Sequence, residues 1–218
     1  MARRLTTILL TIAIGFCLLF LLQSGTTDIR LPGNQRGYQP EQPIQFSHRL
    51  HAGELQVGCL YCHFGAERSQ NAGIPAAGVC MNCHHFVTAP LGSIRAEDEA
   101  AQEEQRQAQL VVSPEIQKLY DAVGFVPNQT AAASTSQTPI VWNKVYTLPD
   151  YVRFDHRPHV TAGVACQTCH GPVETMERVS QVPDLSMGWC VNCHRDATAN
   201  GVAGNPVKAT LDCSACHY

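Results

Sequence analysis

One pattern constrains this chain more than any other: two cysteines separated by two residues, with a histidine directly after the second. From the 11 cysteines and 10 histidines in 218 residues, chance would supply roughly 0.03 copies of that pattern. Five are present, CLYCH at 59–63, CMNCH at 80–84, CQTCH at 166–170, CVNCH at 190–194 and CSACH at 213–217. Such cysteines form two thioethers to the vinyl groups of a haem, and the histidine ligates its iron from one side. The sequence therefore predicts five covalently bound haem c groups.

The motifs assign most of the cysteines and half of the histidines. The expected thioether cysteines are Cys59, Cys62, Cys80, Cys83, Cys166, Cys169, Cys190, Cys193, Cys213 and Cys216. The expected proximal iron ligands are His63, His84, His170, His194 and His217. Disulfide frameworks do not require a histidine after every second cysteine, and zinc knuckles use other spacings, so both alternatives are disfavoured. Cys17 is left over in an apolar run, where we expect a small buried hydrophobic residue.

A second repeated pattern, Phe-x-His-x-x-His, supplies candidates for the opposite, distal iron ligands. His48 and His51 precede the first motif, while His156 and His159 precede the third, 108 residues further along. A spacing of three puts two side chains on one helix face, or lets a tight turn send them to two different irons. The chain therefore reads as an internal duplication of a two-haem unit, with a fifth haem added.

The duplication leaves the fifth haem without a distal ligand, and two residues are candidates. His85 directly follows a proximal ligand, and successive helical residues point about 100° apart, so it could reach a second iron. Met187 lies three residues before Cys190, and a thioether opposite histidine raises the reduction potential of a haem. An iron with both axial positions filled binds no substrate. Full ligation therefore predicts electron transfer, with no catalytic residue on this chain.

The composition suits a protein organised around haem better than a conventional globular one. Charged residues make up 15% of the chain and aromatic residues 7%, which is little material for an ordinary apolar core. Haems bury large apolar faces and crosslink the chain, so they can replace such a core. We therefore predict a mainly α and irregular multihaem cytochrome c domain with few strands. The net charge of −3 gives no basic footprint, so no nucleic-acid partner is expected.

The N-terminus predicts a membrane anchor. Two arginines, Arg3 and Arg4, precede Leu5–Leu22, which contains no charge and would span about 27 Å as a helix. A cleaved signal peptide is the alternative, but the sequence after Leu22 offers only a weak cleavage site. The arginines should stay in the cytoplasm. We therefore expect one N-terminal transmembrane helix that crosses the bacterial cytoplasmic membrane once and places the haem domain on the periplasmic side.

The expected organisation has six parts. They are an anchor (1–23), a tether (24–45), a first dihaem repeat (46–87), a polar helical insertion and linker (88–139), a second dihaem repeat (140–195) and a C-terminal tail with the fifth haem (196–218). Within the insertion, residues 94–110 suit a solvated helix, and Ser113 followed by Pro114 predicts the start of another. Residues 140–154 favour a short extended segment. The charged helices of the insertion are either a connector or a docking site for a partner.

Several segments resemble known multihaem cytochromes. Phe-x-His-x-x-His upstream of a haem motif resembles the class III (c3/c7) cytochromes. The stretches LPDYVRFDHRPHV (148–160) and SMGWCVNCHR (186–195), the C-terminal CHY, and five motifs in this order behind an apolar N-terminus are similar to the pentahaem cytochrome subunits of alternative complex III. This likeness covers nearly the whole chain and is weakest over 88–139.

The resemblance implies membership of a membrane complex that oxidises quinol. The implied partners are a polytopic quinol-oxidising subunit, an iron–sulfur subunit and a monohaem cytochrome c, together with the bilayer through residues 5–22. In a respiratory or photosynthetic membrane, the chain would relay electrons from quinol oxidation to a downstream cytochrome or oxidase. By this resemblance it is an electron-transfer subunit of a quinol oxidoreductase. The implied distal ligands are His48, His51, His156, His159 and, for the odd haem, Met187, whereas His85 matches no motif of that family.

Other classes of function remain open at this stage. A stand-alone membrane-anchored quinol dehydrogenase would need a proton acceptor, and the apolar run contains no acid or histidine. A multihaem reductase would need a haem with an exchangeable axial position, yet each of the five motifs keeps its histidine. A redox-storage cytochrome without a fixed partner is the last alternative.

Overall fold

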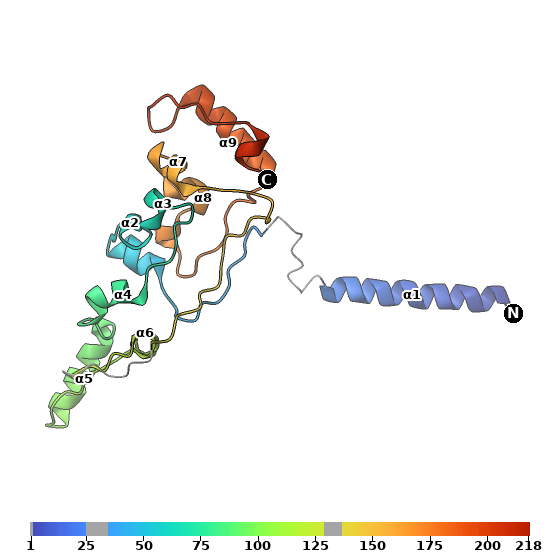
Figure 1. Cartoon of the computed structure of the whole chain (residues 1–218). Helices are drawn as coiled ribbons and strands as arrows, with labels where there is room; N and C mark the ends of the chain where they lie inside the picture. The colour runs from blue at the N-terminus through green and yellow to red at the C-terminus, as the bar shows by residue number, and fades with distance from the viewer. Residues whose placement is uncertain (1, 25–34, 129–136) are drawn as a thin grey trace.

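The computed structural model (Figure 1) describes residues 2–24, 35–128 and 137–218. Its elements are the helices α1 (Ala2–Ser24), α2 (Cys59–Cys62), α3 (Gly65–Arg68), α4 (Ala77–His84), α5 (Leu91–Glu103), α6 (Pro114–Val123), α7 (His156–Thr161), α8 (Cys166–His170) and α9 (Met187–Asn200), the π-helix η1 (Arg49–Glu54), and the 3₁₀ helices η2 (Val173–Thr175) and η3 (Cys213–Ala215). Within those ranges the extended pairing is limited to two isolated bridges, Val152 with His217 and Val202 with Asn205. The predicted mainly α and irregular class is confirmed.

The N-terminal segment forms the helix that the sequence predicts. Large apolar side chains along α1 are exposed, among them Phe16 at 75%. Among the residues that the structure describes, no helix has both the length and the apolarity needed to cross a membrane. This finding does not support the predicted single-pass transmembrane helix over Leu5–Leu22.

The core formed by protein side chains is small. In the described part of the chain, the buried apolar residues are Ala66, Ala89, Ala101, Leu119 and Tyr120. Three of these are alanines, so the apolar area that they remove from water is modest. A small side-chain core is the expected property of a fold in which flat cofactors separate the segments.

The insertion contains two helices, and the first is shorter than predicted. The helix expected over 94–110 is α5, which ends at Glu103. Gln105 takes a left-handed φ of 55°, and the chain then turns back along the helix. Arg106 contacts Glu97 and Glu104 at 2.5 Å, and Glu97 also accepts from the Gln109 backbone N–H at 2.7 Å. These contacts hold residues 104–109 as an irregular strap against α5, so the helix does not continue through them.

The second helix, α6, begins where the sequence predicts. The Ser113 hydroxyl accepts from the Ile116 N–H at 3.3 Å, Pro114 occupies the first turn, and Gly124 ends the helix with a left-handed φ of 67°. Tyr120, which is 0% exposed, donates its hydroxyl proton to the His84 carbonyl at 2.6 Å. The helix α6 thereby packs on α4, which carries the second haem motif.

The tether lies partly outside the described residues, and its described end runs against the second repeat. Gly37 N–H donates to the Gln181 carbonyl at 2.7 Å, and the Gln42 amide exchanges two 2.9 Å hydrogen bonds with the Asn143 backbone. Farther along, Gln45 N–H donates to the Glu115 carboxylate at 2.7 Å. The segment predicted to be extended around Asn143 is therefore held by a side-chain amide instead of a strand ladder.

Gly171, directly after the third motif, generates the first prediction. Its φ is +69°, and a Cβ at this position would lie 2.5 Å from Cγ2 of Val182. We predict that Gly171→Ala destabilises the haem-loaded protein by about 1–3 kcal/mol, measured as a lower Tm. Gly92→Ala in α5 is the matched control, because a Cβ there meets nothing within 4 Å and alanine favours a helix. Equal Tm values for wild type and Gly171→Ala would contradict the close packing of Gly171 against Val182.

Candidate haem-binding site

Four of the five haem motifs form or lie within short α-helices, and the fifth forms a 3₁₀ turn. The helices α2, α4, α8 and α9 and the turn η3 carry the first, second, third, fourth and fifth motifs respectively. One helical turn separates two cysteines three positions apart, so both face the same side. None of the eleven cysteines, all of which lie in the described residues, is paired in a disulfide.

Each predicted distal histidine faces one proximal histidine across a gap. The ring centroids of His48 and His63 are 6.5 Å apart and those of His156 and His170 are 6.4 Å apart, with interplanar angles of 5° and 7°. The corresponding separations are 6.2 Å for His51 and His84 and 5.9 Å for His159 and His194. Metal–imidazole bonds of about 2.0 Å place two rings on opposite sides of one metal with centroids roughly 6 Å apart. The four pairs are therefore spaced so that each could hold one haem iron between its two rings.

Each repeat sends its two adjacent distal histidines to different motifs, and one phenylalanine packs against both. Phe46 stacks on His51 at 4.2 Å and 25° and meets His48 edge-on at 4.9 Å and 84°. Phe154 repeats the arrangement, at 4.7 Å and 30° from His159 and 4.8 Å and 87° from His156. The duplication read from the sequence is thus also a duplication of side-chain geometry.

Backbone carbonyls fix the tautomer of most of these histidines. A carbonyl only accepts, so a ring Nδ1 in contact with one carries the proton and leaves Nε2 as the lone pair for a metal. The Nδ1 contacts are His51 with Ser47, His63 with Gly73, His84 with Val87, His156 with Gln70, His159 with Asp155, His194 with Thr210 and His217 with Tyr151, at 2.6–3.3 Å. Nδ1 of His48 is buried without a partner among the described residues.

Burial also keeps several of these imidazoles neutral. Desolvation, followed by the neighbouring His63 and His51, lowers the pKa of His48 to about 4. Desolvation, followed by His156 and His63, lowers the pKa of His170 to about 4, and burial lowers the pKa of His159 as well. A histidine must be neutral to ligate a metal. At pH 7 these rings are therefore in the ligating state.

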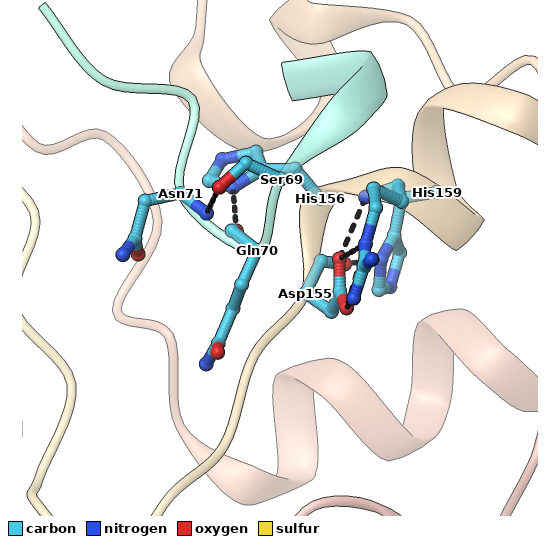
Figure 2. Close-up of polar contacts among 7 residues, drawn as sticks. Ser69, Gln70, Asn71, Asp155, His156 and His159 are labelled. Atoms are coloured by element: carbon cyan, nitrogen blue, oxygen red, sulfur yellow. Dashed lines mark hydrogen bonds and ion pairs between the residues drawn. The ribbon is translucent and has the colours of Figure 1, made fainter. Parts of the chain in front are cut away.

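The two repeats meet at the first and third motifs. Figure 2 shows His156 of the second repeat pointing toward the loop of the first repeat, where its Nδ1 contacts the Gln70 carbonyl at 2.8 Å. The His156 backbone N–H donates to the same carbonyl at 3.2 Å, and α3 packs on α7. Burial, and after it the nearby Cys59, raises the pKa of the Cys166 thiol. The haems of these two motifs would therefore be neighbours.

The remaining motifs extend this junction into a series. Four motif thiols have a pKa raised first by burial and next by a cysteine of an adjacent motif: Cys80 by Cys62, Cys166 by Cys59, Cys169 by Cys193, and Cys190 by Cys216. Figure 1 shows the same succession from α4 through α2 and α8 to α9 and the C-terminus. The spatial order is therefore second, first, third, fourth and fifth, which differs from the order along the chain.

The two candidates for the fifth haem lie at opposite ends of this series. Met187 begins α9, is 66% exposed, and stands one turn before Cys190, whose neighbour is Cys216 of the fifth motif. His85 follows the second motif, and its ring lies 4.4 Å from that of Phe125. Met187 thus lies on the helix of the fourth motif, whose Cys190 neighbours the fifth motif, whereas His85 lies beside the second motif.

Several residues that position the motif histidines could not be identified from the sequence. The carbonyls of Gln70, Gly73 and Thr210 belong to loops, and any residue type provides a carbonyl. Tyr146 donates to the carbonyls of His170 at 3.2 Å and Ser180 at 3.1 Å. Buried hydroxyls of this kind need a partner, but the sequence does not say which one.

Comparison with known proteins first gives the class. Residues 152–218 match the family of cytochrome c7 and related cytochrome c. This range contains the third, fourth and fifth motifs together with His156 and His159. The chain therefore carries a cytochrome c7-like multihaem domain, a class that binds haem c covalently.

A particular relative extends the likeness to most of the chain. Over 199 residues the chain is 25% identical to the multihaem cytochrome c subunit of a menaquinone reductase from Nitratidesulfovibrio vulgaris. The aligned region covers 82% of this chain and 78% of that subunit. The family match does not reach the first repeat or the insertion. The alignment with this subunit must include at least part of them, because it covers 82% of the chain.

The facing pairs predict distinct behaviour for two histidines. We predict that His156→Ala opens one axial position, so that electron paramagnetic resonance of the oxidised protein loses one low-spin signal and gains a high-spin one. His85→Ala is the control, because its ring packs on Phe125 and faces no proximal histidine. An unchanged spectrum for His156→Ala, or a new high-spin signal for His85→Ala, would contradict the ligand assignment.

Proposed function

We propose that this chain binds five haem c groups and relays electrons from quinol oxidation, within a membrane complex, to a downstream cytochrome or oxidase. The observation that carries the proposal is the set of four imidazole pairs, each spaced for one iron and arranged along one continuous series of motifs. An iron closed by two imidazoles exchanges electrons without binding substrate. The name of the relative, a subunit of a menaquinone reductase, supports the link to quinone.

The proposed ligation follows the geometry. The iron pairs are His48 with His63, His51 with His84, His156 with His170, and His159 with His194. Met187 completes the fifth haem opposite His217, which is supported by the contact between the fourth and fifth motifs. A thioether raises the potential of this haem above its bis-histidine neighbours. The chain's own residues supply neutral rings and hold them with carbonyls, whereas the haem supplies the one-electron chemistry.

The proposed setting is the periplasmic side of the bacterial cytoplasmic membrane. The partners are a polytopic quinol-oxidising subunit, an iron–sulfur subunit and a monohaem cytochrome c, as in alternative complex III. The exposed apolar side chains of α1 support attachment to such a complex. In this arrangement the chain carries electrons and performs no substrate chemistry of its own.

Isolation of the native complex tests this function. We expect an affinity tag on this chain to recover polytopic and iron–sulfur subunits, and the haems of that assembly to be reduced by a soluble menaquinol analogue. The chain separated from its partners should be reduced far more slowly, because it provides no site for quinol oxidation. Equal rates for the separated chain and the assembly would favour a stand-alone quinol dehydrogenase instead.

The fifth ligand gives a separate prediction. We expect Met187→Leu to open the fifth iron, so that its low-spin signal is replaced by a high-spin one in electron paramagnetic resonance. Met187→His should restore a low-spin iron with a lower midpoint potential, because imidazole replaces the thioether. A potentiometric titration of the three proteins separates these cases. Identical titrations for all three would remove Met187 from the ligand set.

A further inference from the structure

The end of the molecule that carries the second motif presents a surface that ligation does not explain. A hollow of about 380 Å³ lies there, lined by His85, Phe86, Thr88, Leu110, Phe125, Pro127 and Asn128. Phe86 is 83% exposed and Leu110 is 49% exposed. Large apolar side chains gathered around one hollow mark an interaction site more often than isolated ones do. We call this surface the α4–α6 hollow.

The lining of the α4–α6 hollow begins at the residue after His84 and includes neither the cysteines of the second motif nor His51. Tyr120 of α6 donates to the His84 carbonyl at 2.6 Å and so holds the insertion against the second motif. A molecule seated in the hollow therefore lies next to the second motif, at one end of the series.

The charge around this hollow differs from that of the rest of the chain. Residues 88–128 contain seven acidic and three basic side chains, a net charge of −4, whereas the whole chain carries −3. The remainder is therefore close to neutral at +1. On α5, Asp98, Glu99 and Glu103 are exposed, while Glu97 and Glu104 are held by Arg106. Among the protein side chains, the excess of negative charge therefore lies in the segment that lines and adjoins the hollow.

We propose that the α4–α6 hollow and the acidic face of α5 dock a small soluble electron-transfer protein with a positively charged face around its redox cofactor. This inference rests on the proposed relay and names the partner at one of its ends. Transient redox interfaces are small, with an apolar centre and a charged rim that steers association. One electron passes from the reduced haem of the second motif to the oxidised cofactor of the partner, and no bond forms or breaks.

Reversing the charge of the exposed acidic residues on α5 tests the electrostatic part of this docking site. The probe is a basic monohaem cytochrome c, and the measurement is its rate of reduction by the fully reduced pentahaem protein in stopped flow at several ionic strengths. We expect Asp98→Lys/Glu99→Lys/Glu103→Lys to lower the second-order rate constant at low salt by about tenfold or more and to flatten its salt dependence. Glu41→Lys/Glu67→Lys/Asp196→Lys is the control, with the same change in net charge on exposed acids elsewhere, and should keep most of the wild-type rate.

A second variant tests the apolar centre. Leu110→Ser makes the lining of the hollow more polar, so it should weaken binding of the cytochrome c probe several-fold. Because Leu110 lies outside every haem motif and carries no charge, the haem spectra and the salt dependence of the rate should stay unchanged. Haem absorption and far-ultraviolet circular dichroism confirm that each variant is folded.

The outcomes distinguish this inference from the relay itself. Equal losses for the two triple variants would overturn the docking site, because net charge alone would explain them, and would leave the relay standing. Loss of a tightly bound subunit from the complex of the α5 triple variant would also overturn it, since the occupant would then be permanent. A wild-type protein whose haems do not pass electrons among themselves would refute the proposed function first.

Discussion

The facing of two imidazoles across one metal-sized gap is the interaction on which the rest of this structure depends. His51 and His84 are 33 positions apart and His159 and His194 are 35 apart, so each pair closes a long loop. The helices that bear the ligands are mostly four to eight residues long, well below the length at which an isolated helix is stable in water. With five buried apolar residues in the described chain, side-chain packing contributes little more. In the proposed five-haem protein, iron ligation and thioether bonds would therefore supply most of the order.

The geometry of the repeats explains how two similar units join into one continuous series of haem motifs. Each repeat closes two ligand pairs around a single phenylalanine, and that arrangement alone says nothing of how the units join. The junction comes from His156, which contacts the Gln70 carbonyl of the other repeat through both Nδ1 and the backbone N–H. Because His156 also faces His170, the contact that joins the repeats orients a proposed iron ligand. Association of the two units and ligation within one of them are thus coupled.

Residue types at fixed spacing predict the parts that short-range chemistry determines. The start of α6 after Ser113 is confirmed, whereas the roles of the motif cysteines and proximal histidines stay predictions. The pairing of His51 with His84 and the order of the motifs in space do not, because they depend on loop carbonyls and on packing between repeats. The end of α5 was mispredicted since the strap that Arg106 holds against Glu97 is a tertiary contact. For α1, a run of uncharged residues predicted a helix correctly.

Two unequal additions distinguish the ends of a nearly symmetric set of four histidine pairs. The second and fourth motifs are equivalent by duplication, yet α4 ends with its motif at His84 whereas α9 continues to Asn200 and leads to the fifth motif. One end of the series therefore carries an acidic insertion fixed to the His84 carbonyl by Tyr120, and the other carries His217 near the Met187 end of α9. A duplicated protein would have similar potentials and similar surfaces at its two ends. The proposed Met187 ligand at one end and the acidic side chains of the insertion at the other remove that equivalence, so the two ends suit different partners.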